Sequence, residues 1–140
     1  MDQPVIKIGV GVVIVQDGKT LLAKRKGSHA AGAYGSCGGH VEFGESPLEA
    51  AKREAREELG IEIGNVEFAS CTSLHKDGKH YIDISFTAEI VSGEPKICEP
   101  DRVESLGWYD LNDLPEPLFE PVAIVLEAVR TGKRYFEIQA

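Results

Sequence analysis

The sequence predicts an α/β domain in which a mixed β-sheet is covered by two helices. Short segments rich in β-branched residues and bounded by turn signals alternate with two amphipathic helical segments. The length of 140 residues, with 42% hydrophobic and 27% charged residues, fits one compact domain with its own core. No internal repeat, low-complexity tract or linker interrupts the chain. We therefore expect one domain over residues 1–140, in the order strand, strand, loop, helix, several strands, helix.

The first elements form a hairpin. Residues 5–15 are rich in Val and Ile and predict a buried strand, in which Gly9 and Gly11 allow close backbone approach. Asp17 and Gly18 then supply the positive φ angles of a tight turn, and "TLLAKRK" is the returning strand. Residues 27–44 are glycine-rich and too irregular for a long element. They predict a loop, a short strand and a second loop.

A helix with well-marked ends follows. Ser46 is suited to the N-cap, Pro47 to the first helical position, and Glu49 completes an S-x-x-E capping box. Gly60 is a natural C-cap. At 100° per residue, one side of this helix carries the apolar stripe that we expect to be buried. Its members are Leu48, Ala51, Ala55 and Leu59.

The second half of the chain predicts three strands and a helix. The segments "NVEFASCTSLHK", "KHYIDISFTAEIV" and "ESLGWYDL" are rich in strand formers, and "KDGK" marks a turn between the first two. The segment "FEPVAIVLEAVR" has the period of an amphipathic helix. Its expected inward residues are Val122, Val125, Leu126 and Val129.

Composition excludes several classes of protein. The net charge of −8 disfavours a nucleic acid polymer or an anionic membrane as partner, because the summed field repels phosphates. Apolar runs stay well below the ~20 residues that span a bilayer, and no cleavable signal pattern is present, so we expect a cytoplasmic protein.

The cysteines at 37, 71 and 98 are odd in number and lack C-x-x-C spacing. They predict reduced thiols rather than disulfides or a zinc site.

Three acids crowd the end of the first helix. Glu54, Glu57 and Glu58 lie where the helix dipole disfavours negative charge by roughly 0.3–1 kcal/mol each. Glu54 and Glu58 are one turn apart beside the buried stripe, so both carboxylates point the same way. Oxygen ligands of this kind suit Mg²⁺ or Mn²⁺. From spacing alone, the alternative is a solvated charged face in which Arg53 pairs with Glu49 and Glu57.

The wider segment shifts this choice toward a metal site. Residues 39–61, "GHVEFGESPLEAAKREAREELGI", match the pattern G-x5-E-x7-R-E-U-x-E-E-x-G-U, where U is aliphatic, without a departure. This signature box resembles that of the Nudix hydrolases. The resemblance implies a Nudix α/β/α sandwich with a loop-helix-loop catalytic motif. It also implies metal-dependent hydrolysis of a nucleoside diphosphate linked to another moiety.

The resemblance assigns roles to residues of the box. Glu54 and Glu58 are the expected main Mg²⁺ ligands, with Glu57 close by and the carbonyl of Gly38 as a backbone ligand. Mn²⁺ is the alternative ion. Arg53 and Glu45 are expected to form a buried pair that orients the helix and its carboxylates. Outside the box, Glu104 is the expected general base, and Glu99 is the runner-up.

Weaker similarity extends over most of the chain, through "GVGVVIV", "LLAKRKGS", "HYIDISF" and "LPEPLFEP". These pieces resemble small MutT-type enzymes, and more closely a subgroup of nucleoside triphosphate diphosphatases. The implied reaction converts an unmodified or oxidised (d)NTP to the monophosphate and pyrophosphate. It makes Lys24 and Arg25 candidate phosphate contacts, with a solvated hairpin end as the alternative. The candidate base-pocket residues are His40, His80, Tyr81 and Phe119.

Other readings of the chain stay open. Hydrolysis of ADP-ribose or a nucleotide sugar is the nearest alternative, although we identify no insertion for a second sugar. A non-catalytic nucleotide-binding module is disfavoured because all box carboxylates are retained. Cys37 stands where the relatives carry proline, which removes a φ restraint from the loop. The relatives form homodimers, and we expect the "VGVVIV" strand to contribute if this chain does so.

Overall fold

The computed structural model describes residues 3–27 and 30–139, so Ser28 and His29 of the basic "KRKGSH" segment lie outside the described residues. The elements are β1 (Ile6–Gln16), β2 (Lys19–Arg25), β3 (Tyr34–Gly35), β4 (Cys37–His40), α1 (Pro47–Leu59), β5 (Glu62–Lys76), β6 (Lys79–Ser92), β7 (Val103–Asp110), α2 (Glu120–Thr131) and β8 (Tyr135–Gln139). The predicted order of elements is confirmed, with a second short strand in the glycine-rich segment and an additional strand at the end.

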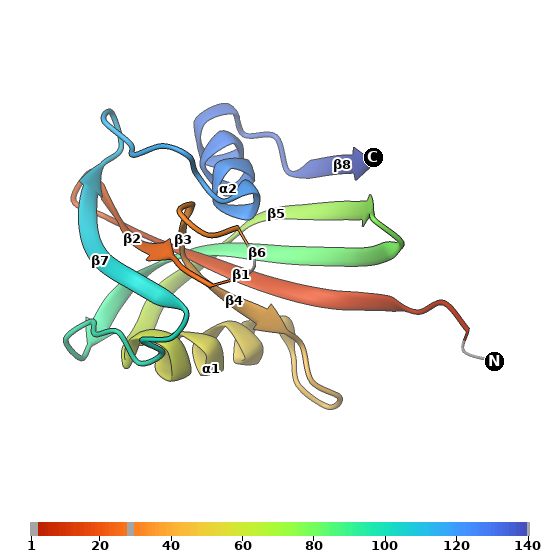
Figure 1. The fold of residues 1–140 in the computed structure, drawn as a ribbon, viewed down its shortest axis with the longest axis horizontal. Helices are drawn as coiled ribbons and strands as arrows, with labels where there is room; N and C mark the ends of the chain where they lie inside the picture. The colour runs from red at the N-terminus through yellow and green to blue at the C-terminus, as the bar shows by residue number, and fades with distance from the viewer. Residues whose placement is uncertain (1–2, 28–29, 140) are drawn as a thin grey trace.

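The strands form one mixed sheet with β1 at its centre (Figure 1). β1 pairs with β6 in parallel and with β4 antiparallel, and its end continues into the hairpin with β2. β2 in turn pairs with β7, and β5 lies between β6 and β8. The two helices lie on opposite sides of this sheet, α1 on one and α2 on the other. The expected α/β/α sandwich is confirmed.

Tight turns explain the β1–β2 and β5–β6 hairpins. Asp17 and Gly18 have φ angles of 54° and 73°, and Asp77 and Gly78 have 54° and 75°. Positive φ at both central residues matches the right-handed twist of the flanking strands, which is why Asp-Gly is favoured there. Both predicted turns are confirmed.

Helix α1 begins and ends as predicted, with one difference in its buried face. The Ser46 side chain accepts from the Glu49 amide at 3.1 Å, the reciprocal bond of the capping box is present, and Gly60 is left-handed. Leu48 is 40% exposed, however, whereas Ala50 is fully buried. The buried face is rotated toward Ala50, so that its centre includes the flank carrying Glu54 and Glu58. Leu48 is left at the rim.

Helix α2 shows a similar shift. Val122 and Val125 are buried as predicted, but Val129 is 53% exposed and Ala128 takes the buried position. The small side chain of Ala128 allows the last turn to approach the sheet closely. Among the described residues no helix is long and apolar enough to cross a membrane.

Strand β1 contributes to both cores, because successive side chains point to opposite faces. Val10, Val12 and Ile14 pack in the core under α1, and Val13 packs in the core under α2. These residues are at most 5% exposed. These side chains pack in the two cores of one chain. The contribution of the "VGVVIV" strand to a homodimer stays a prediction.

A further difference concerns one end of the sheet. β8 pairs in parallel with β5 and was not predicted, because five residues with an exposed-intermediate alternation give little hydrophobic signal. Glu104 lies in β7, within the segment "ESLGWYDL" that was predicted as a strand, because residues 103–110 pair along β2. The three cysteines are free, as predicted.

Candidate active site

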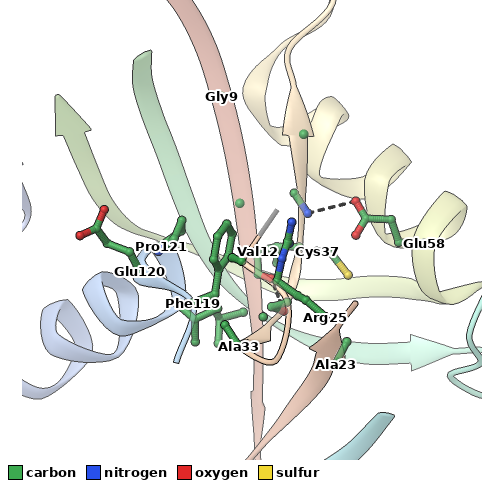
Figure 2. A pocket seen from close by; sticks show the side chains of 18 of the residues that line it. Gly9, Val12, Ala23, Arg25, Ala33, Cys37, Glu58, Phe119, Glu120 and Pro121 are labelled. Carbon is green, nitrogen blue, oxygen red and sulfur yellow. Dashed lines mark hydrogen bonds between the residues drawn. The ribbon is translucent and has the colours of Figure 1, made fainter. Parts of the chain in front are cut away.

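A cavity of about 1080 Å³ opens beside the C-terminal half of α1 (Figure 2). Strands β1, β2 and β4 form its floor and walls, the segment 99–103 covers one side, and residues 118–122 at the start of α2 cover another. Of the predicted site residues, the cavity is lined by Arg25, Gly38, His40, Glu58, Tyr81 and Phe119. The topology therefore brings residues from both halves of the chain to one space.

Glu58 is the acid of the signature box that reaches the cavity wall. The Gly38 amide donates a hydrogen bond to Oε1 of Glu58 at 3.3 Å, which joins α1 to β4 (Figure 2). Burial, followed by the adjoining Glu54 carboxylate, raises the pKa of Glu58 to about 9. Two carboxylates that share a partly buried site repel each other unless a proton or a cation lies between them.

Glu54 lies behind Glu58, directly against β4. A Cβ added at Gly39 would overlap Oε1 of Glu54 and would lie 2.6 Å from its Cδ. Only glycine at this position leaves room for the carboxylate, which is 13% exposed. The backbone of β4 and the helix α1 thus hold Glu54 and Glu58 side by side.

Arg53 organises the acids of α1. Its guanidinium donates to Glu45 from Nε at 2.7 Å and from Nη2 at 3.1 Å, and to Glu54 from Nη1 at 2.9 Å. Nη2 also donates to the carbonyl of His40 at 3.0 Å, which ties the helix to the end of β4. Hydrogen bonds from Arg53 lower the pKa of Glu45, and those to Glu45 raise the pKa of Arg53. Side-chain exposures of 22% and 16% make this pair mostly buried.

The donor set fits a hard divalent ion with few protein ligands. Within residues 3–27 and 30–139, no three His, Cys, Asp or Glu side chains are gathered in a metal-binding group. Glu57 is 57% exposed and receives a 3.3 Å hydrogen bond from Arg53 instead of joining the other two acids. Two carboxylates with a backbone carbonyl suit Mg²⁺, which retains several waters. Zinc or copper sites would need nitrogen or sulfur ligands.

Cationic and aromatic groups face the acids across the cavity. The Arg25 guanidinium lies 4.1 Å from the centroid of the Phe119 ring, and both side chains line the cavity (Figure 2). Burial lowers the pKa of Arg25, and the negative charge of Glu58 opposes that shift. Lys24 is placed elsewhere, because alternate residues of β2 point to opposite faces; it lies 3.5 Å from Glu104 and does not line the cavity.

The segment 94–102 closes the site from the side of α1. The amides of Lys96 and Cys98 donate to the last carbonyls of the helix, at Leu59 and Glu58, at 3.0 and 3.3 Å. This anchoring brings Glu99 to the cavity, where its charge acts on Glu58. Arg102 follows in the same turn and also lines the cavity. Glu104 is 55% exposed and is absent from the lining.

The aromatic candidates divide into two groups. The His40 and Tyr81 rings stack with centroids 5.6 Å apart and an interplanar angle of 20°, and both line the cavity. His80 stacks instead on His75 at 5.0 Å beside the turn of the β5–β6 hairpin, and its side chain does not line the cavity. Asp83 on β6 lines the cavity and was not among the predicted site residues. Its signal was the polar alternation of Tyr81, Asp83 and Ser85 in an otherwise apolar strand.

A mixed sheet between two helices, with arginine-held glutamates at the end of α1 beside a cavity, is the architecture of the Nudix class of proteins. Residues 5–129 match the model of the NUDIX domain, and the chain belongs to the Nudix hydrolase family. Enzymes of this family are pyrophosphohydrolases of nucleotide compounds and generally use divalent ions such as Mg²⁺.

Particular relatives differ in substrate. The chain is similar to a MutT NUDIX hydrolase structure from Burkholderia pseudomallei, with 42% identity, a TM-score of 0.82, and coverage of 89% of this chain and 98% of that one. An ADP-ribose pyrophosphatase of Methanocaldococcus jannaschii is 34% identical over 88% of this chain and 73% of its own length. The NAD-capped RNA hydrolase NudC of Pseudomonas aeruginosa is 36% identical over 74% of this chain. The match covers only 36% of that relative's length.

Proposed function

We propose that this protein is a Mg²⁺-dependent nucleoside triphosphate pyrophosphohydrolase, with Mn²⁺ as the alternative ion. Its substrate is an unmodified or oxidised (d)NTP, and its products are the monophosphate and pyrophosphate. The observation that carries the proposal is that Glu58, Arg25 and Phe119 line the same cavity. Around this one space, Glu58 offers a carboxylate to a metal ion, Arg25 offers a cation to phosphates, and Phe119 offers an aromatic ring to a base.

The residues of the box have two roles, which are to bind the metal ion and to orient its ligands. Glu54, Glu58 and the Gly38 carbonyl would hold the ion, which would neutralise phosphate oxygens and make the attacking water more acidic. Glu57 stands next to this set. Arg53 and Glu45 fix the orientation of the Glu54 carboxylate through the hydrogen bonds described above. Arg25 and Arg102 supply positive charge for the phosphates, and Phe119 presents a ring to the base.

The general base is better placed at Glu99 than at Glu104. Glu99 lines the cavity close enough for its charge to act on Glu58, whereas Glu104 lies on β7 beside Lys24. A base must reach the proton of the attacking water directly or through one further water. We therefore expect Glu99→Gln to abolish the acidic limb of the pH-rate profile. Glu104→Gln should leave that limb in place, and the reverse result would restore Glu104 as the base.

Hydrolysis of ADP-ribose or a nucleotide sugar is the second candidate. It is supported by the name of the M. jannaschii relative and by the coverage of 73% of that protein. Cleavage of such a substrate requires a second pocket for the terminal sugar. The described residues offer one large cavity at the acidic pair, which favours a substrate without a terminal sugar.

A substrate screen with product identification tests the proposal. Purified protein with Mg²⁺ is given the dNTPs, 8-oxo-dGTP, ADP-ribose, NAD, a nucleotide sugar and an NAD-capped RNA oligonucleotide, and the products are separated by ion exchange. We expect monophosphate and pyrophosphate from triphosphates at the highest kcat/KM. Faster cleavage of ADP-ribose or capped RNA would replace the proposed substrate, and no turnover of any compound would refute an enzymatic role.

Two variants connect the activity to the site. Glu58→Gln should lower kcat at least about a hundredfold with the fold retained, because one ligand oxygen loses its charge. Glu127→Gln is the matched control, since Glu127 lies on α2 and pairs with the exposed Arg130. Near-normal activity of Glu58→Gln would overturn the metal-ligand role.

A further inference from the structure

Strand β1 has an open edge over its first residues. The Val41 amide donates to the Ile8 carbonyl at 3.0 Å, so the backbone groups of Ile8 face the side on which β4 lies. β4 ends at His40 and the chain then turns between residues 42 and 45, so that β1 runs on past the end of β4 (Figure 1). Backbone groups alternate along a strand, so the N–H and C=O of Ile6 face the same side as those of Ile8. Within residues 3–27 and 30–139, no backbone group bonds Ile6 on that side.

Exposed apolar side chains surround this edge. Ile6 and Ile8 are 58% and 40% exposed, on the side of the sheet where Val10 continues their row into the core under α1. Phe43, in the turn after β4, is fully exposed, and Val5 is 65% exposed on the opposite side of β1. Together these side chains present on the order of a few hundred Å² of apolar surface, the size at which an exposed patch marks an interaction site.

The open edge at the other end of the sheet differs in charge. β8 is the last strand there and pairs with β5. The Arg134 carbonyl accepts from the Cys71 amide at 2.8 Å, so by alternation the backbone groups of Glu137 face away from β5. Two copies paired about the centre of β8 would place Glu137 opposite itself, which is destabilising. A charged residue in this position protects an edge strand from pairing, whereas β1 has Ile6 at the corresponding place.

We infer that two copies of this chain associate by antiparallel pairing of residues 5–7 of β1, about a two-fold axis at Ile6. In this register the two Ile6 residues exchange both of their free backbone hydrogen bonds, and Val5 of each copy lies opposite Lys7 of the other. The pairing stops before Ile8, because its carbonyl already accepts from Val41 and Pro4, which would lie opposite, has no N–H. The register therefore uses the backbone groups that one chain leaves unpaired. It is independent of the proposed substrate.

The pattern of side chains favours a second copy as the partner at this edge. A strand added beside Ile6 must be apolar at every second position to cover the exposed row, and Pro4, Ile6 and Ile8 of a second copy meet that requirement. Residues 3–8 carry one charge, Lys7, and no acid, so the pairing does not oppose acids although the chain has a net charge of −8. The contact is smaller than the roughly 800 Å² per partner of stable interfaces, so we expect a dissociation constant in the micromolar range.

Sedimentation equilibrium from micromolar to submillimolar protein tests the association. The mean mass of wild type should rise from the chain mass of 15.2 kDa toward twice that value. Added salt should tighten the dimer, because it screens the repulsion between two chains of charge −8. A wild type that stays monomeric at the highest concentration would overturn the inference. A dimer that dissociates on addition of salt would be held by ion pairs elsewhere and would also overturn it.

Substitutions at the two open edges locate the interface. Ile6→Lys places two like charges opposite each other and should weaken the dimer at least about 100-fold, with the circular dichroism and Tm of the dilute protein unchanged. Ile6→Pro should weaken it more than Ile6→Ala, because both lose the side chain but only proline loses the N–H that faces the edge. Tyr135→Lys, at an exposed position on β8, should keep the wild-type dissociation constant. The opposite result, with Tyr135→Lys disrupting the dimer and Ile6→Lys not, would place the interface at β8.

Disulfide trapping tests the register. Residues in a hydrogen-bonded antiparallel pair have Cα atoms about 5.5 Å apart, within the range of a disulfide. In a Cys71→Ser, Cys98→Ser background, oxidised glutathione should therefore convert Ile6→Cys into a covalent dimer. Lys7→Cys in the same background should stay mostly monomeric, because each Lys7 lies opposite Val5 rather than the other Lys7. Efficient trapping through Lys7→Cys but not Ile6→Cys would overturn the register.

Discussion

Replacing Gly39 with alanine adds one methyl group at the point where β4 meets Glu54. The added carbon would overlap Oε1 of Glu54 and lie 2.6 Å from Cδ, whereas ordinary contacts begin near 3.4 Å. The carboxylate must therefore retreat by about 1 Å. Gly39 does not have a positive φ, so alanine suits its backbone and the damage is confined to the side chain of Glu54.

The expected loss of rate in Gly39→Ala follows from how precisely the Glu54 carboxylate must be positioned. A displacement of about 1 Å at a catalytic group costs on the order of a hundredfold in rate. It also lengthens the 2.9 Å hydrogen bond from Arg53, which orients Glu54. We expect Gly39→Ala to lower kcat by about a hundredfold at saturating nucleotide and to weaken Mg²⁺ binding, while circular dichroism stays that of wild type.

The assay compares initial rates over a Mg²⁺ titration with matched variants. Gly107→Ala is the control, because its added methyl would meet only Tyr109 at 3.6 Å, an ordinary contact on β7. Glu54→Asp shortens the side chain and should be less harmful in the presence of Gly39→Ala than in wild type, since the overlap is relieved. A kcat for Gly39→Ala within about threefold of wild type would refute the placement of Glu54 against β4.

Four other expectations concern the same helix. Because folding raises the pKa of Glu58 to about 9, the metal-free folded state binds a proton more tightly than the unfolded state, and its stability should fall as pH rises between about 5 and 9. Bound Mg²⁺ competes with the proton on Glu58, and this competition is weaker at high pH. Saturating Mg²⁺ should therefore raise the Tm more at about pH 8.5 than at about pH 6. An unchanged Tm at both pH values would count against the metal site. Arg53→Lys should reduce kcat by more than tenfold, because an ammonium group cannot make the forked contacts to Glu45 and Glu54. A wild-type kcat in Arg53→Lys would show that only the positive charge matters. Ser46→Ala should lower the free energy of unfolding by about 1 kcal/mol in urea titrations, with the exposed Ser105→Ala as control and no change contradicting the capping role.

Local chemistry explains why much of this fold could be predicted. Several features depend only on a few neighbouring residues, so a short stretch of sequence predicts their geometry. These features are the Asp-Gly turns, the capping box at Ser46 and the left-handed Gly60. The signature box likewise concentrates Arg53 and its glutamates within one helix. Each of these features depends on spacing along the chain, which the sequence states directly.

Features that depend on long-range pairing could not be predicted in the same way. Glu99 reaches the cavity because the amides before it bond to the end of α1, some forty residues earlier in the chain. Lys24 and Arg25 are adjacent, yet only Arg25 faces the cavity, since strand residues alternate and the register of β2 decides which one points inward. A change of one residue in that register would exchange their roles.

Gly9 and Gly39 leave room for carboxylates on opposite faces of the sheet. They lie in adjacent rows, so their missing side chains open space on opposite sides, for Asp83 on the α2 side and for Glu54 on the α1 side. Gly39→Ala should therefore lower kcat, whereas Gly9→Ala should raise KM by displacing Asp83 on the cavity floor, with a smaller effect on kcat. Because the two methyl groups meet different partners on different faces, their effects on activity should multiply in the double variant. A shared, non-multiplicative loss would mean that both substitutions act by distorting β1 and β4 together.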